Sequence, residues 1–195
     1  FSTLGWFNDP LLSTMMKFPD TALVNTVIHE ILHNTIWIGD SVPFNESLAN
    51  FVGSIGAKDF FQARDGAVSE KALLADNQWH DELLYAKFLG ELERELESVY
   101  AKSSSRSDES VITEREKVFA KAQERWKADF EPLLETKGYP QISTKLNNAI
   151  IVADRIYLSS PEIFDRIYNL LGASLSAFVS ELKELEPRRN QGESA

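Results

Sequence analysis

Residues 22–53 read ALVNTVIHEILHNTIWIGDSVPFNESLANFVG, and this stretch decides how the chain is organised. It contains H-E-x-x-H at positions 29–33, inside an almost uniformly apolar segment. Because residues four apart share one face of a helix, the imidazoles of His29 and His33 point the same way and can bind one metal ion. Glu30 lies about 100° further round the helix, beside such an ion and not bound to it.

This arrangement predicts a catalytic zinc site. Neutral imidazole suits Zn²⁺, and a catalytic zinc typically keeps three protein ligands and a water whose pKa falls to about 7. A neighbouring carboxylate accepts the proton of that water during attack on a carbonyl, which is the role predicted for Glu30. The alternative is a buried helix whose imidazoles are satisfied by polar neighbours. The cost of burying a His-Glu-His group among apolar residues argues against that alternative.

The third ligand is predicted to be Glu46. The helix signal stops at residues 39–40, Pro43 permits a tight return, and the following segment has the pattern of a second helix. A second helix packed back on the first would carry Glu46 toward the two histidines. Asn50, one turn later on the same face, can hydrogen-bond a ligating imidazole from outside the coordination sphere, and Asp40 is a weaker candidate for that role.

Composition excludes several classes of protein. The chain has 195 residues, of which 43% are apolar, so it can bury a hydrophobic core. Its net charge of −10 leaves no basic stripe for phosphate contacts, and we expect no nucleic-acid partner. The absence of cysteine excludes disulfides and thiolate zinc ligands. No apolar run approaches the roughly 18 residues of a membrane span, so no transmembrane segment is predicted in this chain.

The pattern around the zinc stretch predicts helices. Residues 1–19 are rich in aromatic and turn residues, and we expect an extended part followed by a short helix or loop, either lining a substrate cleft or plugging the core. Asp20 or Thr21 is the predicted N-cap of the zinc helix. From Val68 onward, apolar residues recur at spacings of three and four, interrupted by the serine-rich loop 101–110, which predicts an antiparallel helical hairpin.

Further helices are predicted at residues 145–158, from Pro161 to Gly172, and at residues 175–185. The adjacent Asn147 and Asn148 suggest either cap chemistry or contacts with a peptide backbone. The expected fold is therefore mainly α: an active-site helix pair, a long antiparallel hairpin and C-terminal helices. We expect a single metallopeptidase domain, 1–195, made of a zinc-site segment (1–66), the hairpin (67–137), the C-terminal helices (138–186) and a frayed tail (187–195).

Four segments together resemble the bacterial predicted aminopeptidase family, a group of zincin-like zinc metallopeptidases of the H-E-x-x-H type. They are STLGWFNDPLLSTMM (2–16), VIHEILHNTIWIGDSVPFNESLANFVGSIGA (27–57), ERELESVYAKSSSRSDES (93–110) and LNNAIIVADRIY (146–157). The resemblance covers roughly residues 1–185. It implies that His29, His33 and Glu46 are the zinc ligands and that Glu30 is the catalytic carboxylate. One departure is Asn34, where the family pattern has Gln, and it leaves the ligands unchanged.

The resemblance also carries expectations about the whole protein. Family members usually begin earlier, with a lipoprotein-like export signal and a further region of strands and helices, whereas this chain begins at Phe1. We therefore expect a C-terminal portion from which most of any sheet flanking the zinc helix is missing. The implied location is the bacterial cell envelope or periplasm, with membrane anchoring through the missing N-terminal segment.

The predicted activity is zinc-dependent hydrolysis of peptides, with removal of N-terminal residues implied by the family name. The oxyanion that forms during attack needs a donor besides zinc. Tyr157 is the first candidate for that donor, with Tyr100, Tyr139 and His80 behind it. Two alternatives stay open: an endopeptidase or another amide hydrolase using the same site, and a helical interaction module without catalysis.

Overall fold

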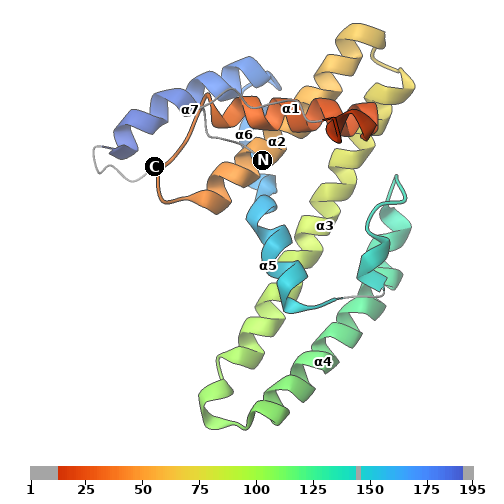
Figure 1. The fold of residues 1–195 in the computed structure, drawn as a ribbon, viewed down its shortest axis with the longest axis vertical. Helices are drawn as coiled ribbons and strands as arrows, with labels where there is room; N and C mark the ends of the chain where they lie inside the picture. The colour runs from red at the N-terminus through yellow and green to blue at the C-terminus, as the bar shows by residue number, and fades with distance from the viewer. Residues whose placement is uncertain (1–12, 144–145, 191–195) are drawn as a thin grey trace. The chain divides into compact units, whose positions relative to one another are not determined.

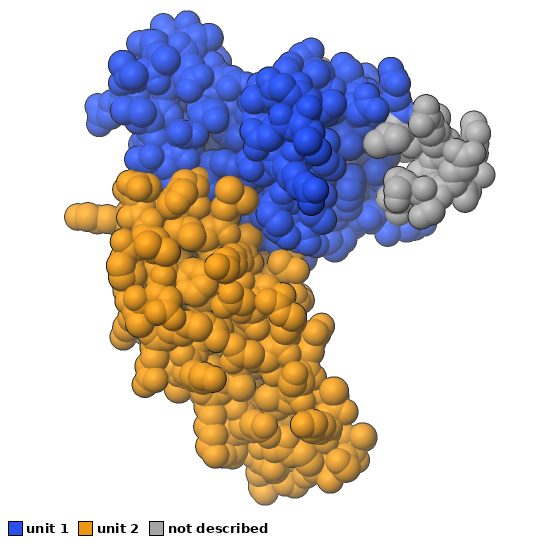
Figure 2. All heavy atoms as spheres, turned by 180° about the vertical axis from the view of Figure 1, so that it is seen from behind, with its two compact units in different colours: residues 1–79, 156–195 blue, residues 80–155 orange. Residues whose placement is uncertain are grey.

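The computed structural model describes residues 13–143 and 146–190, and the chain divides into two compact units. The first unit contains residues 1–79 and 156–195, and the second contains residues 80–155 (Figure 2). Within the described residues every regular element is a helix and no strand is present (Figure 1), which confirms the prediction of a mainly α chain. The division of a single domain into four segments stays a prediction.

The first unit is built on two packed helices, α1 (Asp20–His33) and α2 (Val42–Asp65). The short 3₁₀ turn η1 (Met15–Lys17) precedes them. The unit also contains the start of α3 (Glu70–Tyr100), the end of α5 (Asn148–Tyr157), α6 (Pro161–Leu170) and α7 (Leu175–Asn190). Its core centres on Phe51 of α2, whose ring contacts those of Trp79, Phe164, Tyr168 and Phe178.

The second unit is an antiparallel hairpin with a short return. It contains the remainder of α3, η2 (Ser103–Ser105), α4 (Asp108–Arg125), the π-helical turn η3 (Trp126–Phe130), η4 (Glu131–Leu133), η5 (Pro140–Ser143) and most of α5. Phe88 of α3 meets Trp126 with ring centroids 5.0 Å apart. Arg125 at the end of α4 pairs with Glu91 and Glu95 of α3. These contacts are those expected of the predicted hairpin.

Several predicted boundaries are wrong. α1 begins at Asp20 after Pro19, with no side-chain cap, so neither Asp20 nor Thr21 is its N-cap. It ends at His33, although the apolar pattern continues to residue 38. The side chains of Asn34 and Thr35 bond back to the carbonyls of residues 30 and 31, satisfying acceptors at the helix end.

The later boundaries also differ in detail. α4 already begins at Asp108, because the Ser107 hydroxyl caps it by accepting from the Ser110 N–H, so the loop is shorter than residues 101–110. α7 continues to Asn190, and residues 187–190 are therefore helical and not a frayed tail. Pro161 does open α6, and Gly172, at a φ of 77°, follows its end as predicted. The predicted extended part of residues 1–12 lies outside the described residues.

Across the described parts of the chain, no helix is both long and apolar enough to span a bilayer.

Candidate metal centre

Close packing of α1 on α2 brings the H-E-x-x-H segment and Glu46 together, and two glycines of α2 permit this packing. A Cβ atom added at Gly53 would stand 2.7 Å from Asn25 Oδ1 and 2.9 Å from the Asn25 carbonyl oxygen. One added at Gly56 would stand 2.9 Å from Ile28 Cδ1. Real Cβ atoms do not approach neighbours this closely. At Gly53 the backbone oxygen of Asn25 is in the way, so a larger residue there would force the helices apart, whereas at Gly56 the end of the Ile28 side chain would have to move. The Asn25 amide also donates to the Ser54 hydroxyl at 3.0 Å.

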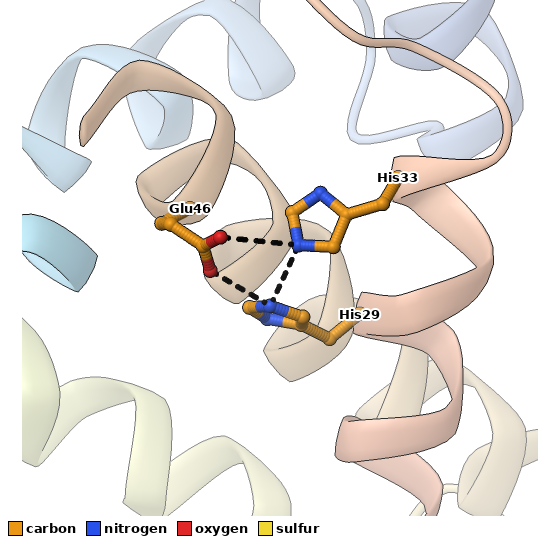
Figure 3. A group of neighbouring side chains, drawn as sticks. All are labelled: His29, His33 and Glu46. Atoms are coloured by element: carbon orange, nitrogen blue, oxygen red, sulfur yellow. Dashed lines mark hydrogen bonds and ion pairs between the residues drawn. The ribbon is translucent and has the colours of Figure 1, made fainter. Parts of the chain in front are cut away.

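His29, His33 and Glu46 form a group that could hold a metal ion, and their ligand atoms all lie within 4.8 Å of one another. The two Nε2 atoms are 3.1 Å apart. Glu46 Oε2 lies 3.2 Å from His29 Nε2, and Glu46 Oε1 lies 3.6 Å from His33 Nε2. Figure 3 shows the two imidazoles of α1 and the carboxylate of α2 turned toward a common point.

These separations fit a tetrahedral ion. Zinc bonds of about 2.0–2.1 Å place neighbouring ligand atoms roughly 3.3–3.4 Å apart. The observed separations of 3.1, 3.2 and 3.6 Å fall on both sides of that value. Two imidazoles and a carboxylate are also a donor set found at catalytic zinc sites. The residues present therefore suit a zinc-like divalent ion.

The protonation of His29 suits metal binding. Burial lowers the pKa of His29 below its usual value, and the nearby His33 lowers it further, against the opposing pull of the Glu46 carboxylate. The neutral imidazole, which is the form that binds metals, is thereby favoured.

One carboxylate oxygen of Glu30 makes no hydrogen bond. Its Oε2 is buried and has no hydrogen-bond partner. Its charge opposes the lowering of the pKa of His29 and contributes to the raised pKa of Tyr157. A buried carboxylate oxygen without a partner is costly, and this oxygen is free to accept a hydrogen bond or a proton.

The residues on both sides of Glu46 fix its surroundings. Asn45 is 2% exposed, and its amide makes two bonds to Ile38: Oδ1 accepts from the N–H at 2.9 Å, and Nδ2 donates to the carbonyl at 2.7 Å. These bonds tie the segment that follows α1 to the start of α2. Ser47 is fully buried, and its hydroxyl donates to the Ser159 carbonyl at 3.1 Å.

The sequence did not reveal these two roles. Both partners are backbone groups, one of them 112 residues away from Ser47. The only signal was the presence of polar residues beside Glu46 in a helix that is otherwise largely apolar.

Tyr157 lies next to the candidate metal-binding group of His29, His33 and Glu46. Its ring centroid is 6.2 Å from that of His29. Burial raises the pKa of Tyr157, and the carboxylates of Glu46 and Glu30 raise it further, so the phenol stays protonated and able to donate a hydrogen bond. Trp37 packs its ring edge-on against His33, with centroids 5.5 Å apart.

The other predicted residues have different surroundings. Tyr100, Tyr139 and His80 belong to the second unit. There Tyr100 exchanges hydrogen bonds with Asn148, Tyr139 packs on Tyr85, and exposed His80 lies 3.3 Å from the Asp81 carboxylate.

Asp40, Asn50 and Asn147 were the remaining polar residues with predicted roles. Asp40 is exposed in the turn before α2 and is not a member of the metal-binding group. The outer role assigned to Asn50 stays a prediction. Asn147 caps α5 by accepting from the Ile150 N–H at 3.1 Å, which confirms cap chemistry at that position.

The fold and the site together define a helical protein with a candidate metal centre between two packed helices. A family model described as "Putative aminopeptidase" matches residues 1–195, and the chain belongs to that family. Comparisons with curated proteins and with solved structures find no match.

Proposed function

We propose that this chain is a zinc-dependent peptidase that acts as an aminopeptidase. The observation that carries the proposal is the convergence of His29, His33 and Glu46 beside the unpaired, buried oxygen of Glu30. The family description supports the reaction class and names the type of peptidase. In this proposal His29, His33 and Glu46 hold the ion. When bound, zinc would polarise the scissile carbonyl and bring the pKa of a water near 7.

The chain's own residues perform the proton transfers. Glu30 accepts the proton of the attacking water through its free oxygen and passes it to the leaving amine. Tyr157 donates a hydrogen bond to the oxyanion, as its raised pKa allows. A peptide is the proposed substrate, and the bacterial cell envelope or periplasm is the proposed location.

The substitution Glu30→Gln tests the catalytic role. It keeps the size of the side chain but removes the base, so kcat is expected to fall by roughly 10²–10⁴-fold while zinc remains bound. Turnover of a series of aminoacyl substrates and zinc content are measured on the same preparation. Glu162→Gln, an exposed glutamate of α6, is the control and should retain full turnover. Undiminished kcat in Glu30→Gln would contradict the role of Glu30 as the base. A wild-type chain that turns over none of these substrates would favour a non-catalytic helical module.

A second experiment separates the aminopeptidase from an endopeptidase on the same site. Peptides of one sequence are offered with a free or an acetylated N-terminus, and products are identified by mass spectrometry. The proposal predicts stepwise loss of N-terminal residues from the free peptide alone. Equal cleavage of both peptides would assign the site to an endopeptidase.

A further inference from the structure

The position of Tyr157 depends on the backbone that follows it. Tyr157 is the last residue of α5, and it is 46% exposed. The exposed part of the ring has no packing contacts to fix it. Its distance from His29 therefore depends on where the end of α5 is held.

The turn after Tyr157 needs support from outside itself. Residues 158–160 connect α5 to α6, and Ser160 has a φ of 58°, a left-handed conformation that is unfavourable for a residue with a Cβ. Such conformations persist where surrounding contacts impose them. Leu158 and Pro161, which flank Ser159 and Ser160, are both buried.

Ser47 supplies one of these contacts. Its side chain is 0% exposed, and its hydroxyl donates to the carbonyl of Ser159 at 3.1 Å. Ser47 directly follows Glu46, so α2 presents a candidate metal ligand and an anchor for the end of α5 on successive residues. We propose that Ser47 is a positioning residue, which acts through Ser159 to hold Tyr157 at its working distance from the metal centre. The importance of that distance for turnover rests on the proposed function.

A structural experiment tests the positioning without any assay of activity. The chain has five tyrosines, so incorporation of 3-fluorotyrosine gives five ¹⁹F resonances, and the spectrum of Tyr157→Phe identifies the resonance of Tyr157. Ser47→Ala is expected to shift or broaden that resonance and leave the other four in place. Ser47→Cys, of nearly the same size with a weaker donor, is expected to do the same and serves if Ser47→Ala does not fold.

Ser54→Ala is the matched control. Ser54 is also a buried serine of α2, but its hydroxyl accepts from Asn25 on α1. Its loss should leave the Tyr157 resonance unchanged. An unchanged Tyr157 resonance in both Ser47 variants, or an equal change in Ser54→Ala, would overturn the positioning role.

Kinetics then show whether Ser47 acts through Tyr157. Ser47→Ala should lower kcat roughly tenfold, the effect of about one hydrogen bond, with KM and zinc affinity within twofold of wild type. The double variant Ser47→Ala/Tyr157→Phe should be no slower than Tyr157→Phe alone. Losses that multiply would overturn the action through Tyr157. If the wild-type chain hydrolyses no peptide, the proposed function falls, and the fluorine spectra still decide the positioning role.

Discussion

At the residue scale, three consecutive side chains of α2 perform three different tasks. Asn45 binds the segment after α1, Glu46 faces the histidines, and Ser47 binds the turn after α5. Each task needs a polar group at a buried or half-buried position, and each of these groups has a partner. Burying these polar groups without partners would cost free energy. Residues 45–47 therefore favour the arrangement of neighbouring segments that supplies those partners.

Asn45→Ala is predicted to destabilise the chain. The substitution leaves the Ile38 N–H and carbonyl without their partners, which costs about 1–3 kcal/mol of the free energy of unfolding. Urea unfolding followed by circular dichroism measures the loss. Asn34→Ala is the control: Asn34 is exposed and makes one bond to the Glu30 carbonyl, so its effect should stay within about 0.5 kcal/mol. Equal losses in the two variants would contradict the role given to Asn45.

Part of the site was predictable from sequence because it depends on local periodicity. His29 and His33 are one helical turn apart, and a second helix, which begins at Val42, brings Glu46 back to them. Their role as ligands stays a prediction. The anchoring by Asn45 and Ser47 was not predictable, since a hydroxyl or an amide can bond to any backbone group nearby. The pattern of apolar and polar residues does not predict which backbone groups lie near these two side chains in the fold.

At the element scale, the contact between α1 and α2 controls the geometry of the candidate centre. Periodicity predicted both helices but placed the end of α1 too late, because the apolar residues 36–38 continue the pattern beyond His33. Asn34 and Thr35 end the helix through bonds to its last carbonyls, and such bonds leave no periodic signal. The chain after His33 is thereby free to reverse and begin α2 at Val42.

Gly53→Ala is predicted to weaken the α1–α2 contact. The added methyl group would overlap Asn25, including its backbone oxygen, so the helices must move apart, at a cost of about 1–3 kcal/mol. Thermal and urea unfolding measure the change. Gly90→Ala is the matched control, because Gly90 is also helical but its nearest neighbour, Arg94 Nη1, lies 3.8 Å from the added Cβ. It should be neutral or stabilising by up to about 1 kcal/mol. A stabilised Gly53→Ala variant would show that the helices do not pack as described.

At the scale of the whole molecule, the second unit has its own aromatic core. Tyr85 donates to the Asp154 carboxylate, packs on Tyr139 with centroids 4.3 Å apart, and meets Trp126 edge-on. Burial raises the pKa of both tyrosines well above the usual value of about 10. The hairpin itself was predictable from its apolar stripe. The pairing of Tyr85 with Asp154 was not, because these residues are 69 positions apart in the sequence. The π-helical turn η3 left no signal in the apolar pattern.

This core predicts an alkaline loss of stability. Above pH 10 the unfolded chain releases the protons of Tyr85 and Tyr139, whereas the folded chain keeps them, so the stability that they contribute is complete below pH 10 and is lost as pH rises. Each tyrosine adds up to about 1.4 kcal/mol per pH unit to the decline. Tyr139→Phe should make the decline of the unfolding free energy shallower by up to about 1.4 kcal/mol per pH unit between about pH 10 and 11.5. Identical slopes in wild type and variant would contradict this account.

Zinc affinity, measured by competition with a chromophoric chelator, tests whether His29 and His33 bind the metal, because each of the three histidines can be removed in turn. We expect one tightly bound zinc per wild-type chain. The zinc affinity of His29→Ala and of His33→Ala should fall by more than roughly 10²-fold, a larger loss than removal of a residue outside the coordination sphere causes. The affinity of His80→Ala should equal that of the wild type. A wild-type chain that binds no zinc, or a His33→Ala variant that binds it as tightly as wild type, would contradict the metal centre.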